Sequence, residues 1–253
     1  MSVIYEPGGR ALEYSLLALN IYQGCSHGCF YCYAKKMAMK FYQQDFDKPV
    51  VKSMLLNRLL DEAPRWSGTD KRVLLCFSCD PYQPLDEKEK LTRAVLQVLK
   101  ENDIHFQILT KGGLRATRDF DLYGPGDAFA TTLTYTSKTL SAAQEPGAAL
   151  PAERMEAIRL AHERGIETWA SLEPVMDVEQ TLDLIRMTSE FVDLYKIGKL
   201  NHYHSDINWR EFGIKAIALC HERGKKYYIK NDLAESLHGV EYTSIDTRRV
   251  KRN

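Results

Sequence analysis

Short runs of apolar residues recur along the chain, and longer polar or amphipathic segments separate them. Each run is rich in Leu, Ile, Val, Phe, Tyr or Thr, which is typical of strands buried within a sheet. The pattern predicts six strands, over residues 16–22, 72–78, 105–110, 128–135, 166–172 and 191–198.

The segments between these runs have helical periodicity. In the first of them, four apolar residues recur at the spacing of one helix face: Leu91, Val95, Val98 and Leu99. Two of the segments end in the sequence HERG, and their terminal residues, Gly165 and Gly224, are typical of helix C-termini. The pattern predicts helices over 86–102, 151–165, 177–190 and 207–224.

Strand and helix patterns therefore alternate about six times, without a Pro-, Gly- or Ser-rich break. Such an order predicts an α/β fold with parallel strands and right-handed crossovers. No Gly-rich phosphate loop follows the first strand, which favours a partial (β/α)6 barrel of the TIM type over an open doubly wound sheet. We expect one domain over 1–253, with its core at about 15–200 and an extension over 201–253. Residues 226–237 suit one more strand or an edge segment.

Composition and charge bear on where the protein is located rather than on what it does. Lys plus Arg and Asp plus Glu number 34 each, so the net charge gives no global attraction to nucleic acid. No apolar run reaches the roughly 18 residues of a membrane span. The N-terminus has no basic segment followed by an apolar one, as a secretory signal would. We expect a cytoplasmic protein with no membrane partner.

Three of the six cysteines, Cys25, Cys29 and Cys32, lie within the stretch CSHGCFYCY, after the first predicted strand. Structural zinc sites usually have four ligands, and a fourth is not evident here, since His27 would compete with a tight turn at Gly28. Three thiolates on one loop suit a [4Fe–4S] cluster that leaves one iron without a protein ligand. Zinc binding by the same residues is the alternative.

The spacing C-x3-C-x2-C resembles the signature of the radical S-adenosylmethionine (SAM) superfamily. The resemblance implies that the amino and carboxylate groups of SAM bind the open iron. It also implies reductive cleavage of SAM to a 5'-deoxyadenosyl radical, which abstracts hydrogen from a substrate. An external one-electron reductant of the flavodoxin or ferredoxin type is then required. Tyr31, just before the last cysteine, is expected near the adenine.

Longer segments resemble spore photoproduct lyase and the wider group described as DNA repair photolyase-like. The resemblance covers about residues 15–200 and rests on the segments YCYA (31–34), SCDPYQPLDEKEKLTRAVLQVL (78–99), ILTKGGLRATRDFDL (108–122) and SLEPVMD (171–177). It implies that Tyr31 and Tyr33 relay a hydrogen atom, that Cys79 donates one to a product radical, and that Lys111 binds the SAM carboxylate. The C-terminal substrate-contacting region of the lyase has no recognisable match.

Further candidates for SAM contacts lie near the predicted strand ends. Asp80 is a candidate for the SAM amino group or the substrate, and capping of a helix near Asp86 is its alternative role. Thr132 and Thr134 share one face of the predicted strand, because side chains alternate with a period of two. One of them is a candidate for the ribose or amino group, with core packing an equally good account. Glu173 is a candidate for ribose or substrate. The full set of cofactor candidates is Tyr31, Ser78, Asp80, Lys111, Thr132, Thr134, Glu173 and Lys199.

The other cysteines have simpler explanations. If residues 72–78 continue as a strand, Cys76 and Cys79 are three positions apart and point to opposite faces, so we expect neither a shared metal nor a redox pair. For Cys79 a core role is as well supported as hydrogen donation. We expect Cys76 and Cys220 to be core residues.

Three functional hypotheses follow. The first is a lyase-like radical SAM enzyme acting on a nucleic-acid base or DNA lesion. The second keeps this chemistry with a peptide or small metabolite as substrate, which the neutral net charge favours slightly. The third is a zinc-stabilised binding module.

Overall fold

One parallel sheet forms the centre of the molecule, and the computed structural model describes residues 2–41 and 45–250. Its seven strands lie in the order β1–β4–β5–β6–β7–β8–β9, and all neighbouring strands are parallel. Their bounds are Leu17–Leu19, Val73–Leu75, Phe106–Thr110, Ala128–Thr132, Glu167–Leu172, Leu194–Ile197 and Lys226–Ile229. Because β1 and β9 form opposite edges, the sheet is a partial barrel, which confirms the predicted fold class.

Each of the six predicted strands has a counterpart, but most are shorter than predicted. The strand expected over 72–78 ends at Leu75, and that expected over 128–135 ends at Thr132. The loops that follow these strands therefore begin earlier and contain more of the candidate residues. The suspected additional strand is β9, which pairs with β8 and extends the sheet beyond residue 200.

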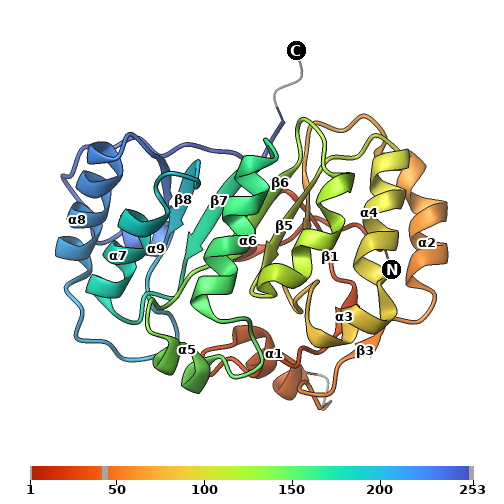
Figure 1. The fold of residues 1–253 in the computed structure, drawn as a ribbon, viewed down its shortest axis with the longest axis horizontal. Coiled ribbons are helices and arrows are strands. Elements are labelled where there is room, and N and C mark those ends of the chain that lie inside the picture. The colour runs from red at the N-terminus through yellow and green to blue at the C-terminus, as the bar shows by residue number, and fades with distance from the viewer. Residues whose placement is uncertain (1, 42–44, 251–253) are drawn as a thin grey trace.

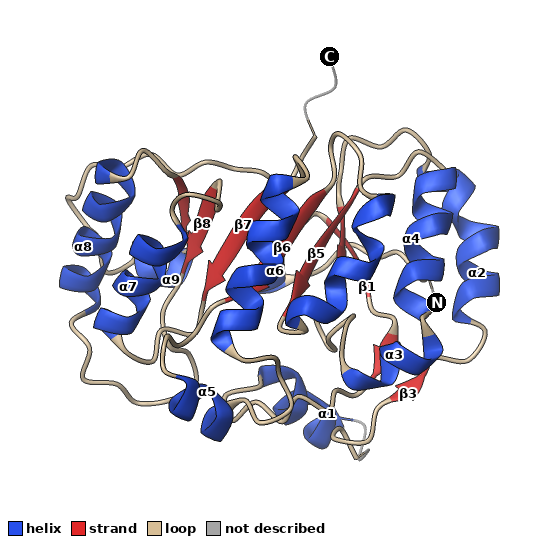
Figure 2. Ribbon diagram, in the orientation of Figure 1, coloured by secondary structure: helices blue, strands red, loops and turns tan. Residues whose placement is uncertain are grey.

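Helices cover one face of the sheet and close one of its ends. Figure 1 shows α2, α4, α6, α7 and α8 along that face, with α1 and α5 at the end toward which the strand arrows of Figure 2 point. The helices α1 to α9 span Tyr33–Phe41, Leu55–Glu62, Pro84–Glu89, Leu91–Glu101, Lys138–Gln144, Pro151–Glu163, Val178–Thr188, Trp209–Glu222 and Asn231–Ala234. Three 3-10 helices, η1 to η3, span Gly9–Glu13, Ala63–Trp66 and Gly113–Leu122, and β2 (Tyr22–Gln23) pairs antiparallel with β3 (Val50–Val51).

The helix predicted over 86–102 is in fact two helices, α3 and α4. Lys90 separates them in the left-handed region, with φ of 49°. The buried carboxylate of Asp86 accepts a hydrogen bond from the backbone N–H of Thr92 at 2.9 Å, in the first turn of α4. A side chain within the predicted helix thus caps the next helix and supports the break.

Strand side chains alternate between two apolar layers. In β4, Val73 and Leu75 belong to the large core beneath the helices, whereas Leu74 belongs to a smaller cluster with Trp169 on the concave face. This two-residue period is what a sheet covered on both faces requires. None of the helices within 2–41 and 45–250 is long and apolar enough to cross a membrane.

Helix α2 provides a matched test of this packing, because its neighbouring leucines differ in burial. Leu59 is fully buried, whereas Leu60 is 49% exposed. We expect Leu59→Ala to lower the free energy of unfolding by about 2–5 kcal/mol, since it leaves a cavity in the core. Leu60→Ala should change it by less than about 1 kcal/mol. Urea unfolding of both variants measures the difference, and equal losses would contradict the described packing.

Candidate functional site

The three clustered cysteines lie in the loop between β2 and α1, at the C-terminal end of the sheet. This loop follows β1 as predicted, although β1 ends at Leu19 and the short strand β2 intervenes. Cys25, Cys29 and Cys32 all line one cavity of about 880 Å³. Such a volume lies within the range of small-molecule and cofactor sites.

Backbone hydrogen bonds hold the cysteine loop in place. The N–H of Cys25 donates to Phe46 O at 2.8 Å, and the N–H of Phe30 donates to Gln144 O at 2.9 Å. His27 O accepts from the N–H of Gly147 at 2.8 Å. A side chain at Gly147 would collide with the backbone of Ser26, so only glycine permits this close approach.

The donor chemistry of the loop fits an iron–sulfur cluster. The three thiols face the same cavity, and soft thiolates are the usual ligands of such clusters. Within 2–41 and 45–250, no three Cys, His, Asp or Glu side chains converge on a point where one metal ion could bind. A cluster needs no such convergence, because each thiolate binds a different iron, whereas a structural zinc ion needs four converging ligands.

Asp80, in the loop after β4, is the polar centre of this end of the sheet. Its carboxylate accepts hydrogen bonds from Tyr82 N at 2.9 Å, Thr110 Oγ1 at 2.6 Å and Lys111 N at 2.7 Å. It also lies 3.5 Å from Nδ1 of His27. The expected capping of a helix near Asp86 is therefore not its role, because Asp80 instead joins the ends of β4 and β5 to the cysteine loop.

His27 is an internal partner of Asp80. It is buried, and its Nε2 lies 3.4 Å from Nη2 of Arg115. Burial lowers its pKa to about 4, aided by the charges of Lys111 and Arg115 and opposed by Asp80. The ring is thus neutral at pH 7, with one nitrogen facing Asp80 and the other Arg115.

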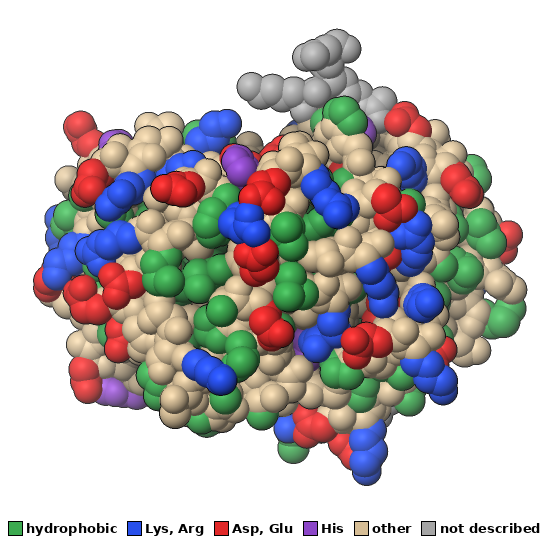
Figure 3. All heavy atoms as spheres, in the orientation of Figure 1, with side chains coloured by type: hydrophobic (Ala, Val, Ile, Leu, Met, Phe, Trp, Pro, Cys, Tyr) green, Lys and Arg blue, Asp and Glu red, His purple; other side chains and the backbone are tan. Residues whose placement is uncertain are grey.

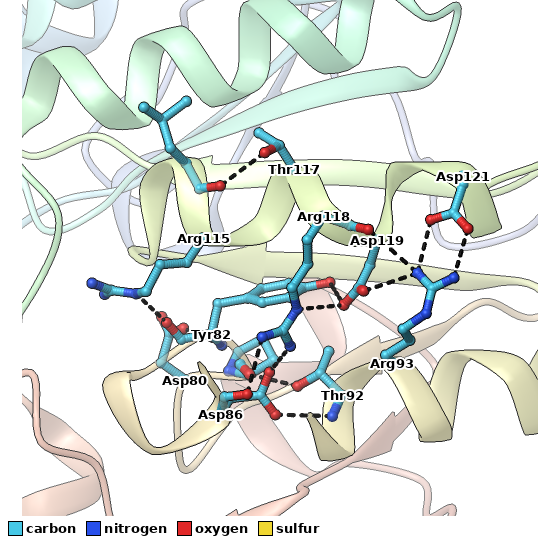
Figure 4. Close-up of polar contacts among 12 residues, drawn as sticks. Asp80, Tyr82, Asp86, Thr92, Arg93, Arg115, Thr117, Arg118, Asp119 and Asp121 are labelled. Carbon is cyan, nitrogen blue, oxygen red and sulfur yellow. Dashed lines mark hydrogen bonds and ion pairs between the residues drawn. The ribbon is translucent and has the colours of Figure 1, made fainter. Parts of the chain in front are cut away.

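The segment after Asp80 fixes the cysteine loop through a fully buried glutamine. Gln83 accepts from Ser26 N at 3.0 Å and donates to Gly24 O at 3.3 Å. Arg115 donates to Tyr82 O at 2.8 Å from η3 on the other side (Figure 4). The segment DPYQP therefore supports the cysteine loop.

Behind this support lies a network of charged side chains, shown in Figure 4. Arg118 of η3 bonds the buried carboxylate of Asp86, and Tyr82 Oη donates to Asp119 at 3.1 Å. Arg93 of α4 reaches Asp119 at 3.2 Å and forms two bonds to Asp121. These contacts join α3, α4 and η3 to one another.

Tyr31 lines the cavity and is held by its hydroxyl. That hydroxyl donates to Glu145 and lies 3.2 Å from Oγ1 of Thr134. Glu145 in turn pairs with the buried Arg154 at 2.6 Å. Burial and the Glu145 carboxylate raise the pKa of Tyr31 well above its usual value, so the phenol keeps its proton.

Lys111 reaches the same region from the end of β5. Its ammonium lies 5.3 Å from the centre of the Tyr31 ring. Burial lowers its pKa, but the nearby charges of Cys29 and Glu145 more than reverse this, and the pKa is raised. Lys111 is therefore a cation beside the cysteine loop, as a partner for a carboxylate would be.

Glu173 marks the opposite wall, at the end of β7. Its carboxylate accepts from Tyr14 Oη at 2.8 Å and from Asn201 Nδ2 at 2.8 Å, and it pairs with the buried Lys230. Ser171 completes the group, 3.0 Å from Tyr14 Oη. All five side chains line the cavity.

The remaining candidate residues fall into two groups, those that line the cavity and Thr134, which does not. Ser78, Cys79, Thr132, Tyr33 and Lys199 line the cavity. Tyr33 is 44% exposed at its mouth and donates to Phe77 O at 2.5 Å.

Thr134 lies past the end of β6 and is absent from the cavity wall as described. Its hydroxyl donates to Glu145 at 3.2 Å beside Tyr31. The expectation that Thr132 and Thr134 share one strand face fails because β6 ends at Thr132.

The expectation for Cys76 and Cys79 also fails, because β4 ends at Leu75. Past the strand end the period of two no longer applies. Both line the cavity, and Cys76 also packs in the core as expected.

Sequence reasoning missed several residues of the site: Tyr14, Gln83, Glu145, Arg154 and Lys230. Gln83 lies within the segment 78–99 that carries part of the resemblance, and Lys230 lies within the suspected additional strand segment 226–237. The local sequence therefore gave a reason to consider both. Tyr14 had none, since its partner Glu173 lies 159 residues away. Glu145 and Arg154 lie only nine residues apart, but neither belongs to a recognised motif.

Comparison with known proteins agrees with this geometry. The profile of the Radical SAM superfamily matches residues 19–192, a range that contains the cysteine loop and strands β4 to β7. Similar curated proteins include an uncharacterised protein of Methanocaldococcus jannaschii, 27% identical over 186 residues, which are 72% of this chain and 70% of that protein. An uncharacterised protein of Mycobacterium tuberculosis is 29% identical over 179 residues, covering 67% of this chain. The match spans only 52% of the mycobacterial protein.

Solved structures share the fold at low sequence identity. Spore photoproduct lyase complexed with dinucleoside spore photoproduct has a TM-score of 0.70 and 11% identity, over 89% of this chain and 79% of the lyase. Streptococcus suis SuiB bound to S-adenosylmethionine has a TM-score of 0.64 and 13% identity, over 89% of this chain and 53% of SuiB.

The role of Gln83 can be tested with a substitution of similar size. Gln83→Met removes both bonds to the cysteine loop and leaves the N–H of Ser26 without its partner, at a cost of about 1–3 kcal/mol. We expect lower stability and faster loss of bound iron, measured by urea unfolding and by iron content over time. Gln97→Met, at an exposed position of α4, is the matched control. Iron retention equal in the two variants would contradict the support role.

Proposed function

Because this chain belongs to the radical SAM superfamily, a superfamily of enzymes, we propose that Cys25, Cys29 and Cys32 bind a [4Fe–4S] cluster that acts on SAM in the adjoining cavity. The observation that carries the proposal is that these three cysteines share one cavity with Tyr31, Lys111 and Glu173. When bound, the cluster and SAM together supply a 5'-deoxyadenosyl radical for hydrogen abstraction.

The residues of the cavity have distinct proposed tasks. Lys111 offers a cation to the SAM carboxylate, and Tyr31, fixed by Glu145 and Thr134, presents its ring to the adenine. Thr132 and Glu173, which also line the cavity, are the proposed contacts of the ribose or amino group. Ser78 and Lys199 line the space between these groups.

In this proposal Asp80 positions other residues and does not itself bind SAM. Three hydrogen bonds from its own chain occupy its carboxylate, so it orients Lys111 and the cysteine loop. Tyr33 and Cys79 are the proposed carriers of a hydrogen atom, with Tyr31 as the second tyrosine beside Cys32. An external one-electron reductant of the flavodoxin or ferredoxin type completes the system.

For the substrate we propose a nucleic-acid base or base lesion, as in a lyase-like reaction. The support is the charge of the cavity wall. Lys52, Lys111 and Lys199 line the cavity, and within the described ranges no carboxylate forms an ion pair with their ammonium groups. With Lys111 assigned to the SAM carboxylate, Lys52 and Lys199 are the cations left for a substrate. On the face drawn in Figure 3, by contrast, acidic and basic side chains are interspersed. An anionic substrate such as a phosphodiester would thus meet its counter-charges in the cavity, whereas a neutral peptide or metabolite would leave them unpaired.

The cluster proposal is tested by anaerobic reconstitution with iron and sulfide, followed by a strong reductant and SAM. We expect an oxygen-sensitive brown protein that forms 5'-deoxyadenosine. Replacing Cys25, Cys29 or Cys32 singly by Ala should abolish product formation, because each provides one ligand, while far-UV circular dichroism stays unchanged. Cys220→Ala, on the buried face of α8, should retain activity. Wild-type protein that holds zinc but no iron would overturn the proposal in favour of a binding module.

The substrate proposal predicts salt-dependent binding to DNA. We expect affinity for a UV-irradiated oligonucleotide to fall steeply as salt rises, because bound phosphates release counter-ions. Lys52→Gln and Lys199→Gln should each reduce the slope of log affinity against log salt by about one. Lys88→Gln, at an 86% exposed site outside the cavity, is the control. Weak binding without salt dependence would instead favour a peptide or metabolite.

A further inference from the structure

A pair of aromatic side chains, Phe30 and Tyr203, lies at the rim of the cavity. Their ring centres are 4.8 Å apart, and Tyr203 Oη donates a hydrogen bond to the backbone oxygen of Phe30 at 3.0 Å. Neither residue lines the cavity, but their sequence neighbours do, namely Cys29 and Tyr31 beside Phe30 and His202 beside Tyr203. The pair therefore joins the cysteine loop to the segment after β8, next to the cavity.

The exposure of Phe30 sets it apart from the other aromatic residues. Its side chain is 55% exposed, although it lies between two residues that line the cavity. Within 2–40 and 45–250, Tyr33 at the cavity mouth is the one other exposed aromatic residue. Tyr203 is half-buried and covers only part of Phe30. Much of the Phe30 ring is thus open to a ligand that extends out of the cavity.

A cation accompanies the aromatic pair. The ammonium of Lys36, on α1, lies 3.8 Å from the centre of the Tyr203 ring. Lys36 is exposed, and the carboxylate of Asp47 pairs with its neighbour Lys35 instead. An open ring beside an exposed cation matches the two parts of a nucleotide, because the base has a flat π face and the phosphate is an anion.

Two kinds of partner could use such a surface, a nucleic-acid strand and the external electron-carrying protein. The continuity of the surface with the cavity favours the strand. A strand whose reacting base occupies the cavity must leave it across the rim, where its next base and phosphate meet Phe30 and Lys36. The cations on the cavity wall, Lys52 and Lys199, have the charge that the same strand requires. An electron carrier does not enter the cavity, so its docking accounts for none of this continuity.

We propose that Phe30 is a stacking platform for the base next to the reacting one in a single strand of nucleic acid, with Lys36 at its phosphate. The proposal names a subsite for the substrate and rests on the proposed function. A base that is taken out of its stack leaves the adjacent base without a partner on one face. An aromatic side chain can replace that partner. In an intact duplex both faces of the adjacent base are already stacked, so we expect a preference for single strands.

The experiment measures binding of a fluorescently labelled oligonucleotide to the full chain, with its cluster reconstituted anaerobically. The oligonucleotide is presented as a single strand and as a duplex, over a range of salt concentrations. Phe30→Leu keeps an apolar side chain but removes the flat ring, and it should weaken single-strand binding roughly 5- to 100-fold. The slope of log affinity against log salt should stay unchanged, because the ring carries no charge. Phe30→Trp should bind at least as tightly as wild type.

Two further variants separate stacking from charge and from general surface effects. Lys36→Gln should reduce the slope against salt by about one, because one phosphate contact is lost. Met39→Ala, at a 64% exposed position of α1 outside the cavity wall, is the control and should bind as wild type. Iron content and far-UV circular dichroism show whether each variant keeps the cysteine loop and the fold.

The outcomes distinguish this proposal from the proposed function. Equal single-strand binding by wild type and Phe30→Leu overturns the platform and leaves a nucleic-acid substrate standing, as does a loss in Phe30→Trp as large as that in Phe30→Leu. Wild-type protein without salt-dependent binding overturns both. If Phe30→Leu slows reduction of the cluster by a flavodoxin while oligonucleotide binding stays unchanged, the surface is an interface for the electron carrier and the platform is wrong.

Discussion

The burial of one carboxylate, that of Asp80, is the constraint on which the site depends. A buried carboxylate needs hydrogen bonds to replace those it made with water. Its donors come from Tyr82, Thr110 and Lys111, and it faces His27 in the cysteine loop. Because these groups belong to three separate loops, satisfying one carboxylate sets the positions of all three relative to one another.

Residues bonded to Asp80, or close to it in sequence, make further contacts that connect other segments to the site. The backbone of Lys111, held by Asp80, also accepts from Ala149 N at 2.9 Å, which joins the end of β5 to the start of α6. Gln83, three residues after Asp80, holds the cysteine loop, and Arg115 spans from η3 to both Tyr82 and His27. Gln83, Tyr82, Arg115 and Ala149 are not among the residues that line the cavity, yet they position the cysteine loop, His27 and Lys111, which are.

The parts of this arrangement that the sequence predicted are those governed by local pattern. Apolar runs marked the strands of a parallel sheet, and parallel strands place their C-terminal ends on one edge. The cysteine loop, Lys111 and Glu173 each follow such a run, so their gathering at one cavity was predictable. The same reasoning failed where a strand ended early. Thr134, Cys76 and Cys79 were assigned faces by a period of two that stops at Thr132 and Leu75. Strand length depends on tertiary pairing, which the local pattern does not contain.

Contacts between remote segments set the remaining features, above all the balance of charge. Glu145, beside Tyr31, is neutralised by Arg154, and Glu173 of the cavity wall by Lys230 with Tyr14 and Asn201. Asp80 also lines the cavity and is held by hydrogen bonds, facing His27. The ammonium groups of Lys52, Lys111 and Lys199 have no comparable partner in the ranges described. In a concave, partly desolvated space such an imbalance is amplified, because low-dielectric walls focus the field. A chain with zero net charge can therefore carry a locally positive cavity, and the sign of the cavity rather than that of the chain bears on what it binds.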